Sequence, residues 1–179
     1  MKLLAFAGSS SSTSINKKLA TYAAGLIDAA ETEIIDLNDF ELPLFSVDKE
    51  KLIGAPPVAR VFLDKIEWAD MLVISVAEHN AGMTVAFKNI YDWASRQKKL
   101  VFDNKPILLL STSPGGYGAK NSLEAAKISL PRYGGDIRDT FSLPKFHENF
   151  DVEAGKISNK EYDDALKEII RNFDHEQKA

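Results

Sequence analysis

Residues 9–14 place six hydroxyl side chains in a row, Ser-Ser-Ser-Ser-Thr-Ser, between a short apolar run and a helix-like stretch. Hydroxyl groups donate hydrogen bonds to an oxyanion, and the first turn of a helix adds unpaired N–H groups and a partial positive charge. No lysine or arginine occurs between Leu3 and Asn16. A strand, a polar loop and a helix start in this order predict an anion site that binds through hydroxyls and amides alone.

The loop lacks the Gly-Lys-Ser/Thr ending of a Walker phosphate loop. A monophosphate therefore fits it better than a triphosphate with magnesium, and flavin mononucleotide (FMN) is the leading candidate. The alternative is a solvated serine-rich turn that only caps the helix, since Ser and Asn are favoured at that position for capping alone.

Two further loops have unusual composition. Residues 77–82 are polar and end in small residues. Such a loop can bring its backbone and hydrogen-bond donors close to the edge of a flat ring. Within it, His79 either stacks on the ring or stays solvated, and Glu78 either faces the site or forms an ion pair at a subunit contact. Residues 111–118 hold three glycines, which permit positive φ and close approach of the backbone to a ligand. Tyr117 either packs on the ring or is a surface aromatic.

Apolar runs alternate with helix-like segments along the chain. We expect strands at residues 3–7, 33–37, 71–76, 106–110 and 136–141, and helices at residues 15–30, 58–69, 83–95, 119–130 and 158–173. Ser158 is expected to cap the last helix, with Glu161 completing a capping box. Residues 38–57 contain three prolines and a glycine and are expected to be mostly loop. The apolar stripe of the helix at 83–95 is expected to be core or subunit interface; its members are Met83, Phe87, Ile90, Tyr91 and Ala94.

Five strands alternating with helices predict an α/β protein with a parallel sheet covered on both faces. The leading topology is a flavodoxin-like three-layer fold with strand order 2-1-3-4-5 and a single domain over residues 1–179. In that fold ligands bind at the carboxyl ends of the strands, where the strand order reverses. The three unusual loops follow the first, third and fourth strands, so they should converge there.

Composition limits the class of protein. A length of 179 residues suits one domain, and a net charge of −4 does not favour nucleic-acid binding. The absence of cysteine excludes disulfides, a thiolate nucleophile and iron–sulfur ligation, and three dispersed histidines predict no metal site. No secretory leader and no apolar run of membrane-spanning length is evident, so we expect a cytoplasmic protein.

These motifs resemble the NADPH-dependent FMN reductases, a family of flavin, quinone, chromate and azo-dye reductases. The family's Gly-Ser-x-Arg-x-x-Ser-x-Asn is matched by Gly8, Ser9, Ser14 and Asn16. Its Pro-Glu-Tyr-Asn and Leu-Lys-Asn-x-x-Asp-Trp fall on residues 77–80 and 87–93, and its glycine-rich loop resembles residues 111–118. The family arginine is Ser11 here, its Pro and Tyr are Ala77 and His79, and its Pro-Gly is replaced by Thr-Val at residues 84–85.

The resemblance implies an FMN-dependent reductase that takes a hydride from NADPH or NADH and reduces a small acceptor by a ping-pong scheme. It implies no catalytic side chain and a homodimer or homotetramer, with the helix at 83–95 at an interface. The expected flavin-binding residues are Ser9, Ser11, Ser14, Ile15, Asn16, Glu78, His79, Asn80, Ala81, Ser113, Pro114, Gly115, Gly116 and Gly118.

Two other interpretations stay open. One is an electron-transfer flavodoxin without its own NAD(P)H site, although flavodoxins are usually more acidic than a net charge of −4. The other is a flavin-free scaffold of the same fold, because the family's arginine and tyrosine are missing at Ser11 and His79.

Overall fold

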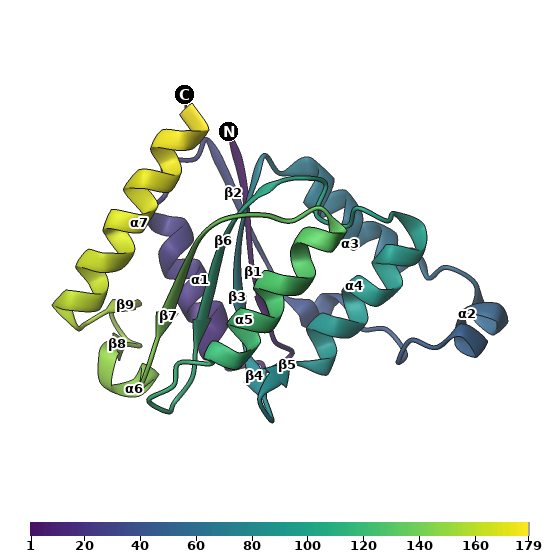
Figure 1. Ribbon diagram of the computed structural model, residues 1–179, viewed down its shortest axis with the longest axis horizontal. Coiled ribbons are helices and arrows are strands. Elements are labelled where there is room, and N and C mark those ends of the chain that lie inside the picture. The colour runs from purple at the N-terminus through teal and green to yellow at the C-terminus, as the bar shows by residue number, and fades with distance from the viewer. Residues whose placement is uncertain (179) are drawn as a thin grey trace.

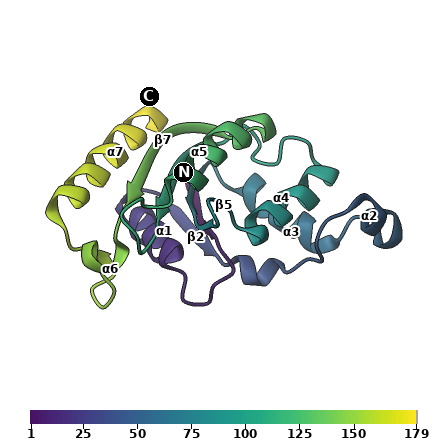
Figure 2. The ribbon, with the colours of Figure 1, turned by 60° about the horizontal axis from the view of Figure 1, so that its bottom comes forward.

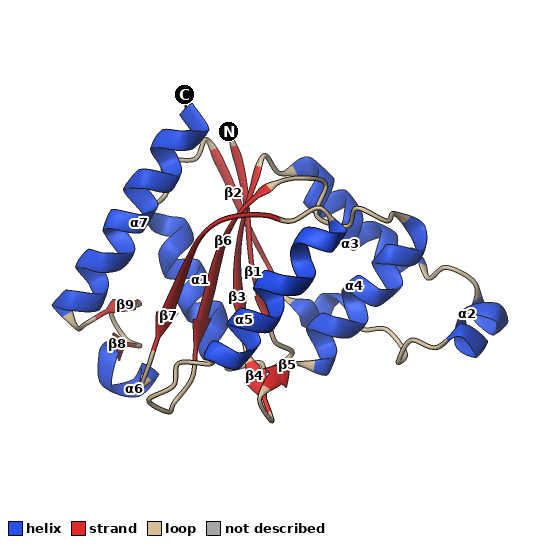
Figure 3. Ribbon diagram, viewed as in Figure 1, coloured by secondary structure: helices blue, strands red, loops and turns tan. Residues whose placement is uncertain are grey.

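The computed structural model describes residues 1–178 and is built on a parallel five-stranded sheet with the order β2-β1-β3-β6-β7 (Figures 1 and 3). The strands are β1 (Lys2–Gly8), β2 (Glu31–Ile35), β3 (Met71–Val76), β6 (Pro106–Thr112) and β7 (Asp136–Leu143). Counted along the chain, these five strands have the predicted order 2-1-3-4-5. The flavodoxin-like fold class is therefore confirmed.

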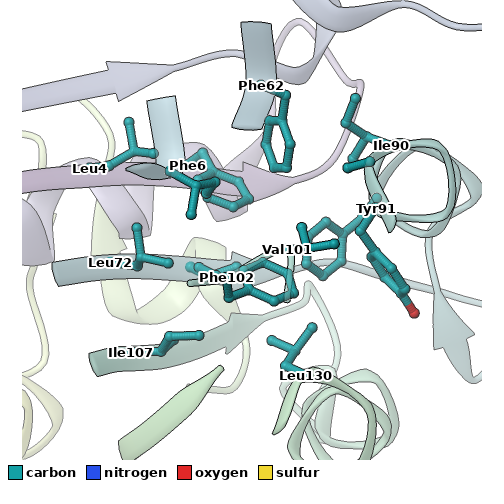
Figure 4. Packing of buried hydrophobic residues seen from close by; sticks show 14 of the residues in the cluster. Leu4, Phe6, Phe62, Leu72, Ile90, Tyr91, Val101, Phe102, Ile107 and Leu130 are labelled. Carbon is teal, nitrogen blue, oxygen red and sulfur yellow. The ribbon is translucent and has the colours of Figure 1, made fainter. Parts of the chain in front are cut away.

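Helices cover both faces of the sheet because side chains alternate along each buried strand. In β1, Leu4 and Phe6 point to one face, and Leu3 and Ala5 point to the other. The first face packs against α3 (Pro57–Trp68), α4 (Val85–Gln97) and α5 (Lys120–Ser129), as Figure 4 shows for part of this core. The second face packs against α1 (Ile15–Leu26) and α7 (Lys160–Lys178). No helix within residues 1–178 is both long and apolar enough to cross a bilayer.

Several short elements were not predicted. Residues 38–57, expected to be mostly loop, overlap the 3₁₀-helix η1 (Leu37–Phe40) and contain α2 (Val47–Ile53), which projects from the body and buries none of its side chains (Figure 1). Four two-residue strands form two hairpins, β4–β5 (Glu78–His79, Gly82–Met83) and β8–β9 (Phe150–Asp151, Lys156–Ile157). The others are η2 (Leu130–Tyr133) and α6 (Phe146–Asn149).

The expected cap of the last helix was wrong by one residue. The side chain of Asn159, not Ser158, accepts a hydrogen bond from the backbone N–H of Glu161, at 3.1 Å. The N–H of Ser158 donates instead to the carbonyl of Asn149, because the β8–β9 hairpin brings the two together. The Ser158–Glu161 capping box therefore does not form. The first helix is also shorter than expected, since it ends at Leu26 and β2 begins at Glu31.

A buried asparagine at the start of α1 ties this helix to two strands. The side-chain oxygen of Asn16 accepts hydrogen bonds from the hydroxyl of Ser75 in β3, at 2.8 Å, and from the N–H of Thr112 in β6, at 3.0 Å. Its amide nitrogen donates to the carbonyl of Thr112, at 3.0 Å. All three contacts are buried, so each polar group depends on the others for a partner.

We predict that Asn16→Ala lowers the free energy of unfolding by about 2–4 kcal/mol, because it leaves buried groups of Ser75 and Thr112 without partners. Urea unfolding followed by circular dichroism measures the change. Asn38→Ala is the matched control, since Asn38 is exposed and its amide donates to the carboxylate of Asp36, so its loss should cost less than about 0.5 kcal/mol. Equal costs for the two variants would contradict the role given to Asn16.

Candidate functional site

The three unusual loops meet at the carboxyl ends of β1, β3 and β6, the end brought forward in Figure 2. They enclose a cavity of about 380 Å³. Nine of the fourteen expected site residues line it: Ser9, Ser11, Ser14, Ile15, Asn16, Glu78, His79, Ser113 and Pro114. Thr13, Ala77 and Thr112 complete the lining. The other five expected residues, Asn80, Ala81, Gly115, Gly116 and Gly118, are not part of the wall.

The first loop presents hydrogen-bond donors to the cavity. Ser14 caps α1, its side chain accepting from the N–H of Lys17 at 3.2 Å, and Ser9 accepts from the N–H of Ser11 at 3.2 Å. Within the described chain, no protein acceptor takes up the N–H groups of Ile15 and Asn16, which belong to the first turn of the helix. These amides and the neighbouring hydroxyls fit an anion such as a phosphate monoester.

Among the residues that the structure describes, no lysine or arginine lines this cavity. The nearest lysine in the sequence, Lys17, instead places its ammonium 2.6 Å from the carboxylate of Asp36. Burial alone would raise the pKa of Asp36, but its hydrogen bonds with Lys17 and Asn38 lower it overall. Asp36 therefore stays ionised and holds Lys17 away from the cavity.

The second loop is a tight hairpin. Asn80 and Ala81 are its two turn residues and both have positive φ, 51° and 60°, which is typical of a type I′ turn. This geometry puts both residues at the tip, away from the cavity wall, while the exposed His79 lines the wall. Glu78 lines it too, and its carboxylate accepts hydrogen bonds from the side chain of Asn121 at 3.0 Å and the N–H of Ser122 at 3.1 Å. Glu78 thereby anchors the hairpin to the first turn of α5.

The third loop is anchored from β7 and α6. The carbonyl of Gly118 accepts from the hydroxyls of Ser111 and Ser142, at 2.7 and 2.9 Å. The carbonyls of Gly115 and Ser113 accept from two backbone N–H groups at the start of α6, at 2.9 and 3.0 Å. These bonds hold the loop in one place over the end of the sheet.

The glycines of this loop have different structural requirements. Gly118 has a φ of +66°, and a Cβ there would lie 2.3 Å from the hydroxyl oxygen of Ser142, so the fold itself needs glycine. At Gly115 and Gly116 a Cβ would meet nothing within 4 Å. No contact within the described protein requires glycine at these two positions. Close approach of a ligand to the backbone would require it. Tyr117 is 59% exposed and lies at the surface beside Lys120.

Thr84, which stands with Val85 in place of the family's Pro-Gly, does not line the cavity but supports the site through a cap that was not predicted. It caps α4, accepting from the N–H of Phe87 at 3.2 Å, and its hydroxyl donates to the carbonyl of Gly8 at 2.8 Å. The start of α4 is thus tied to the end of β1, where a Cβ on Gly8 would come within 3.0 Å of the Phe87 ring. A threonine just before an amphipathic helix is the signal that could have identified this cap.

Most of the apolar stripe on α4 is core, since Phe87, Ile90, Tyr91 and Ala94 are buried.

Comparisons with known proteins agree with this geometry. The family model described as NADPH-dependent FMN reductase matches residues 1–148. A protein described as an NAD(P)H-dependent FMN reductase from Pseudomonas aeruginosa is 34% identical over 119 residues, 66% of this chain and 63% of that protein, so the match spans less than two thirds of the relative. An NADPH:quinone oxidoreductase from Arabidopsis thaliana is 29% identical over 177 residues, 95% of this chain and 88% of that protein.

Solved structures show the same fold. The flavoenzyme NAD(P)H:acceptor oxidoreductase FerB from Paracoccus denitrificans superposes with a TM-score of 0.77 at 24% identity, over 97% of this chain and 95% of that one. An FMN-dependent NADH-azoreductase from Bacillus anthracis, solved in complex with FMN, gives a TM-score of 0.64 at 15% identity, over 97% and 100% of the two chains. With the family model covering most of its length, this chain belongs to the family of NADPH-dependent FMN reductases.

Proposed function

We propose that this protein is an NAD(P)H-dependent reductase that uses FMN to move electrons from a nicotinamide coenzyme to a small acceptor such as a flavin or quinone. The two substrates would use the same site in turn, in a ping-pong scheme. The observation that carries the proposal is the cavity between three loops, with free amide and hydroxyl donors on one wall. We treat residues 1–179 as one flavin-binding domain of a cytoplasmic protein.

The donors of the first loop suit the phosphate of FMN. The hydroxyls of Ser9, Ser11 and Ser14 and the N–H groups of Ile15 and Asn16 would bind it. Since no lysine or arginine of the described residues lines the cavity, N–H and O–H dipoles and the partial positive charge at the N-terminus of α1 would stabilise the phosphate charge. The side-chain oxygen of Asn16 already accepts two hydrogen bonds from β3 and β6, and its amide nitrogen donates to β6, so we assign its backbone N–H to the phosphate.

The other two loops suit the ring. Residues 78–81 would lie at one edge of the isoalloxazine, and Ser113, Pro114, Gly115, Gly116 and Gly118 would offer backbone close to it. When bound, FMN supplies two-electron redox chemistry that needs no protein acid or base. The protein's own contribution is to bind and orient the cofactor and to leave one face open for the substrates.

The first prediction from this proposal concerns the cofactor and the activity together. Protein loaded with FMN and passed through gel filtration should keep the visible bands of oxidised flavin, and those bands should bleach when NADPH is added without oxygen. Absorption spectroscopy measures both. Retained flavin that NADPH does not bleach would favour an electron-transfer flavodoxin. Failure to bind FMN, together with no reduction of free FMN, would favour a flavin-free scaffold.

The second prediction uses the two kinds of glycine in the third loop. Gly116→Ala should leave the melting temperature unchanged and weaken FMN binding about tenfold or more, because the new methyl group meets no protein atom within 4 Å and would stand between the loop and the ring that we place against it. Gly118→Ala should lower stability by about 1–3 kcal/mol, because it strains a positive φ and clashes with Ser142. Thermal unfolding and calorimetric titration separate the two effects. A Gly116→Ala protein with normal FMN affinity would contradict the placement of the ring.

We also propose that the protein forms a homodimer or homotetramer through the face around the start of α4. Large apolar side chains are exposed there: Leu44 is 67% exposed and Val85 is 64% exposed. Two adjoining hollows of about 410 and 300 Å³ share Leu44, Val85 and Asn89 in their walls. α2, which Glu50 ties to Arg96 at the other end of α4, adds Val47 and Leu52, which are 57% and 78% exposed. Exposed apolar groups gathered in this way are typical of interaction surfaces.

The third prediction tests this interface. Val85→Asp should shift the protein toward monomers in sedimentation equilibrium, because it buries a charge in the contact, while a carboxylate in the first turn of α4 does not harm the helix. Ile128→Asp is the control, since Ile128 is similarly exposed, at 66%, but lies on α5. A wild-type monomer, or an oligomer that Val85→Asp leaves intact, would contradict the proposed interface.

A further inference from the structure

His79 lies on β4 at the carboxyl end of the sheet, between the other two loops of the site (Figure 1). β3, which leads into the β4–β5 hairpin, is paired with β1 on one side and with β6 on the other. The hairpin therefore stands between the loop after β1 and the loop after β6. Because the loop after β1 is assigned to the phosphate, His79 belongs to the part of the cavity that is assigned to the ring.

The backbone of His79 is held in place, whereas its imidazole is free. His79 pairs with Gly82 across the hairpin, and Glu78 ties the hairpin to the side chain of Asn121 and the N–H of Ser122, at 3.0 and 3.1 Å. Among the residues that the structure describes, none forms a hydrogen bond or an ion pair with the imidazole, which is exposed and lines the cavity. Both ring nitrogens of His79 are therefore available to a ligand.

Of the described residues in the cavity wall, His79 alone can carry a positive charge, and an imidazole changes its charge between about pH 5 and 8. The other ionisable group in the wall is Glu78, whose carboxylate is bound at the first turn of α5. On α5, which packs against β4, Lys120 lies over an aromatic ring, 6.0 Å from its centre, and Glu124 pairs with Lys127 at 3.0 Å. β5 and the other two loops contribute no charged side chain to the wall.

A positive charge at this place would distinguish the two redox states of FMN. A hydride from the nicotinamide coenzyme brings two electrons and one proton to the flavin ring, so the ring gains one negative charge. A cation beside the ring therefore stabilises reduced FMN more than oxidised FMN. Neutral hydroxyl and amide donors interact with the added charge more weakly than a cationic donor does.

We propose that protonated His79 stabilises reduced FMN, so that bound FMN becomes easier to reduce as the pH falls through neutrality. The inference rests on the proposed function, because it starts from a flavin ring in this cavity. The sign follows from linkage: the negative charge of the reduced ring favours protonated His79, so protonation of His79 favours the reduced ring by the same factor. The stabilisation is present at acidic pH and is lost at alkaline pH, where the imidazole is neutral.

The test is the reduction potential of bound FMN relative to that of free FMN, measured by spectroelectrochemical titration at about pH 6 and about pH 8.5. Subtracting the value for free FMN removes the pH dependence of the flavin itself. At the lower pH, the equilibrium constant for reduction should be about tenfold larger in the wild type than in His79→Gln, or ~30 mV for two electrons. At the higher pH this difference should vanish. His79→Lys should keep the raised potential at both pH values, because its charge persists.

His147→Gln is the matched control, because His147 is exposed on α6 and does not line the cavity. It should leave the potential unchanged, and a change equal to that of His79→Gln would overturn the assignment. Equal potentials of the wild type and His79→Gln, or a His79→Lys protein without a raised potential at alkaline pH, would also overturn it.

Two further outcomes separate the ring from the phosphate and this inference from the proposed function. If His79→Gln weakens the binding of oxidised and reduced FMN equally, the imidazole contacts the phosphate and its assignment to the ring is wrong. In that case the protein still binds FMN and the proposed function stands. If the wild type binds no FMN at all, the proposed function fails and this inference fails with it.

Discussion

The geometry of the site depends on one buried amide, the side chain of Asn16. It takes hydrogen bonds from β3 and β6 and returns one to β6, so the first turn of α1 is fixed against the two central strands that carry the other loops. Because the serine-rich loop runs directly into this turn, its N–H groups point where the strands end. Thr84 adds a second tie, from α4 to the last carbonyl of β1. The loop is therefore held at both ends by buried polar contacts, while its middle stays open to a ligand.

The other two loops likewise combine backbone that is fixed by hydrogen bonds with backbone that is exposed to a ligand. Glu78 fixes the base of the β4–β5 hairpin to α5 and leaves His79 and the turn exposed. The glycine-rich loop is anchored through the carbonyls of Ser113, Gly115 and Gly118, and Gly116 lies free between the last two of these anchors. A cofactor bound here would meet preorganised backbone, which reduces the ordering that binding requires. We expect this preorganised backbone to offset, in part, the charge that an arginine at the position of Ser11 would supply.

The sequence predicted the features that follow from periodicity. Buried apolar runs predicted the five strands, and their alternation with helices favoured the order 2-1-3-4-5. That order placed the three loops at one end of the sheet. Features set by tertiary contacts were not predictable in the same way. The β8–β9 hairpin has strands of only two residues, yet it brings Ser158 to the carbonyl of Asn149 in α6, and the helix cap is Asn159 instead. Asn80 and Ala81 adopt positive φ although neither is glycine, so the turn that places them at the hairpin tip was not predicted. β3 contains one serine, Ser75, inside its apolar run. A buried serine indicates a polar contact, but the patterns that predict strands do not identify its partner, Asn16.

The central claim is that hydroxyls and helix amides, without a lysine or arginine in the described cavity wall, bind the phosphate of FMN. The most direct measurement is a calorimetric comparison of FMN with riboflavin, which carries the same ring and ribityl chain but no phosphate. If the loop after β1 is the phosphate site, FMN should bind about ten- to a hundredfold more tightly, and the difference should shrink as inorganic phosphate is added. Equal affinities for FMN and riboflavin, unaffected by phosphate, would contradict the account.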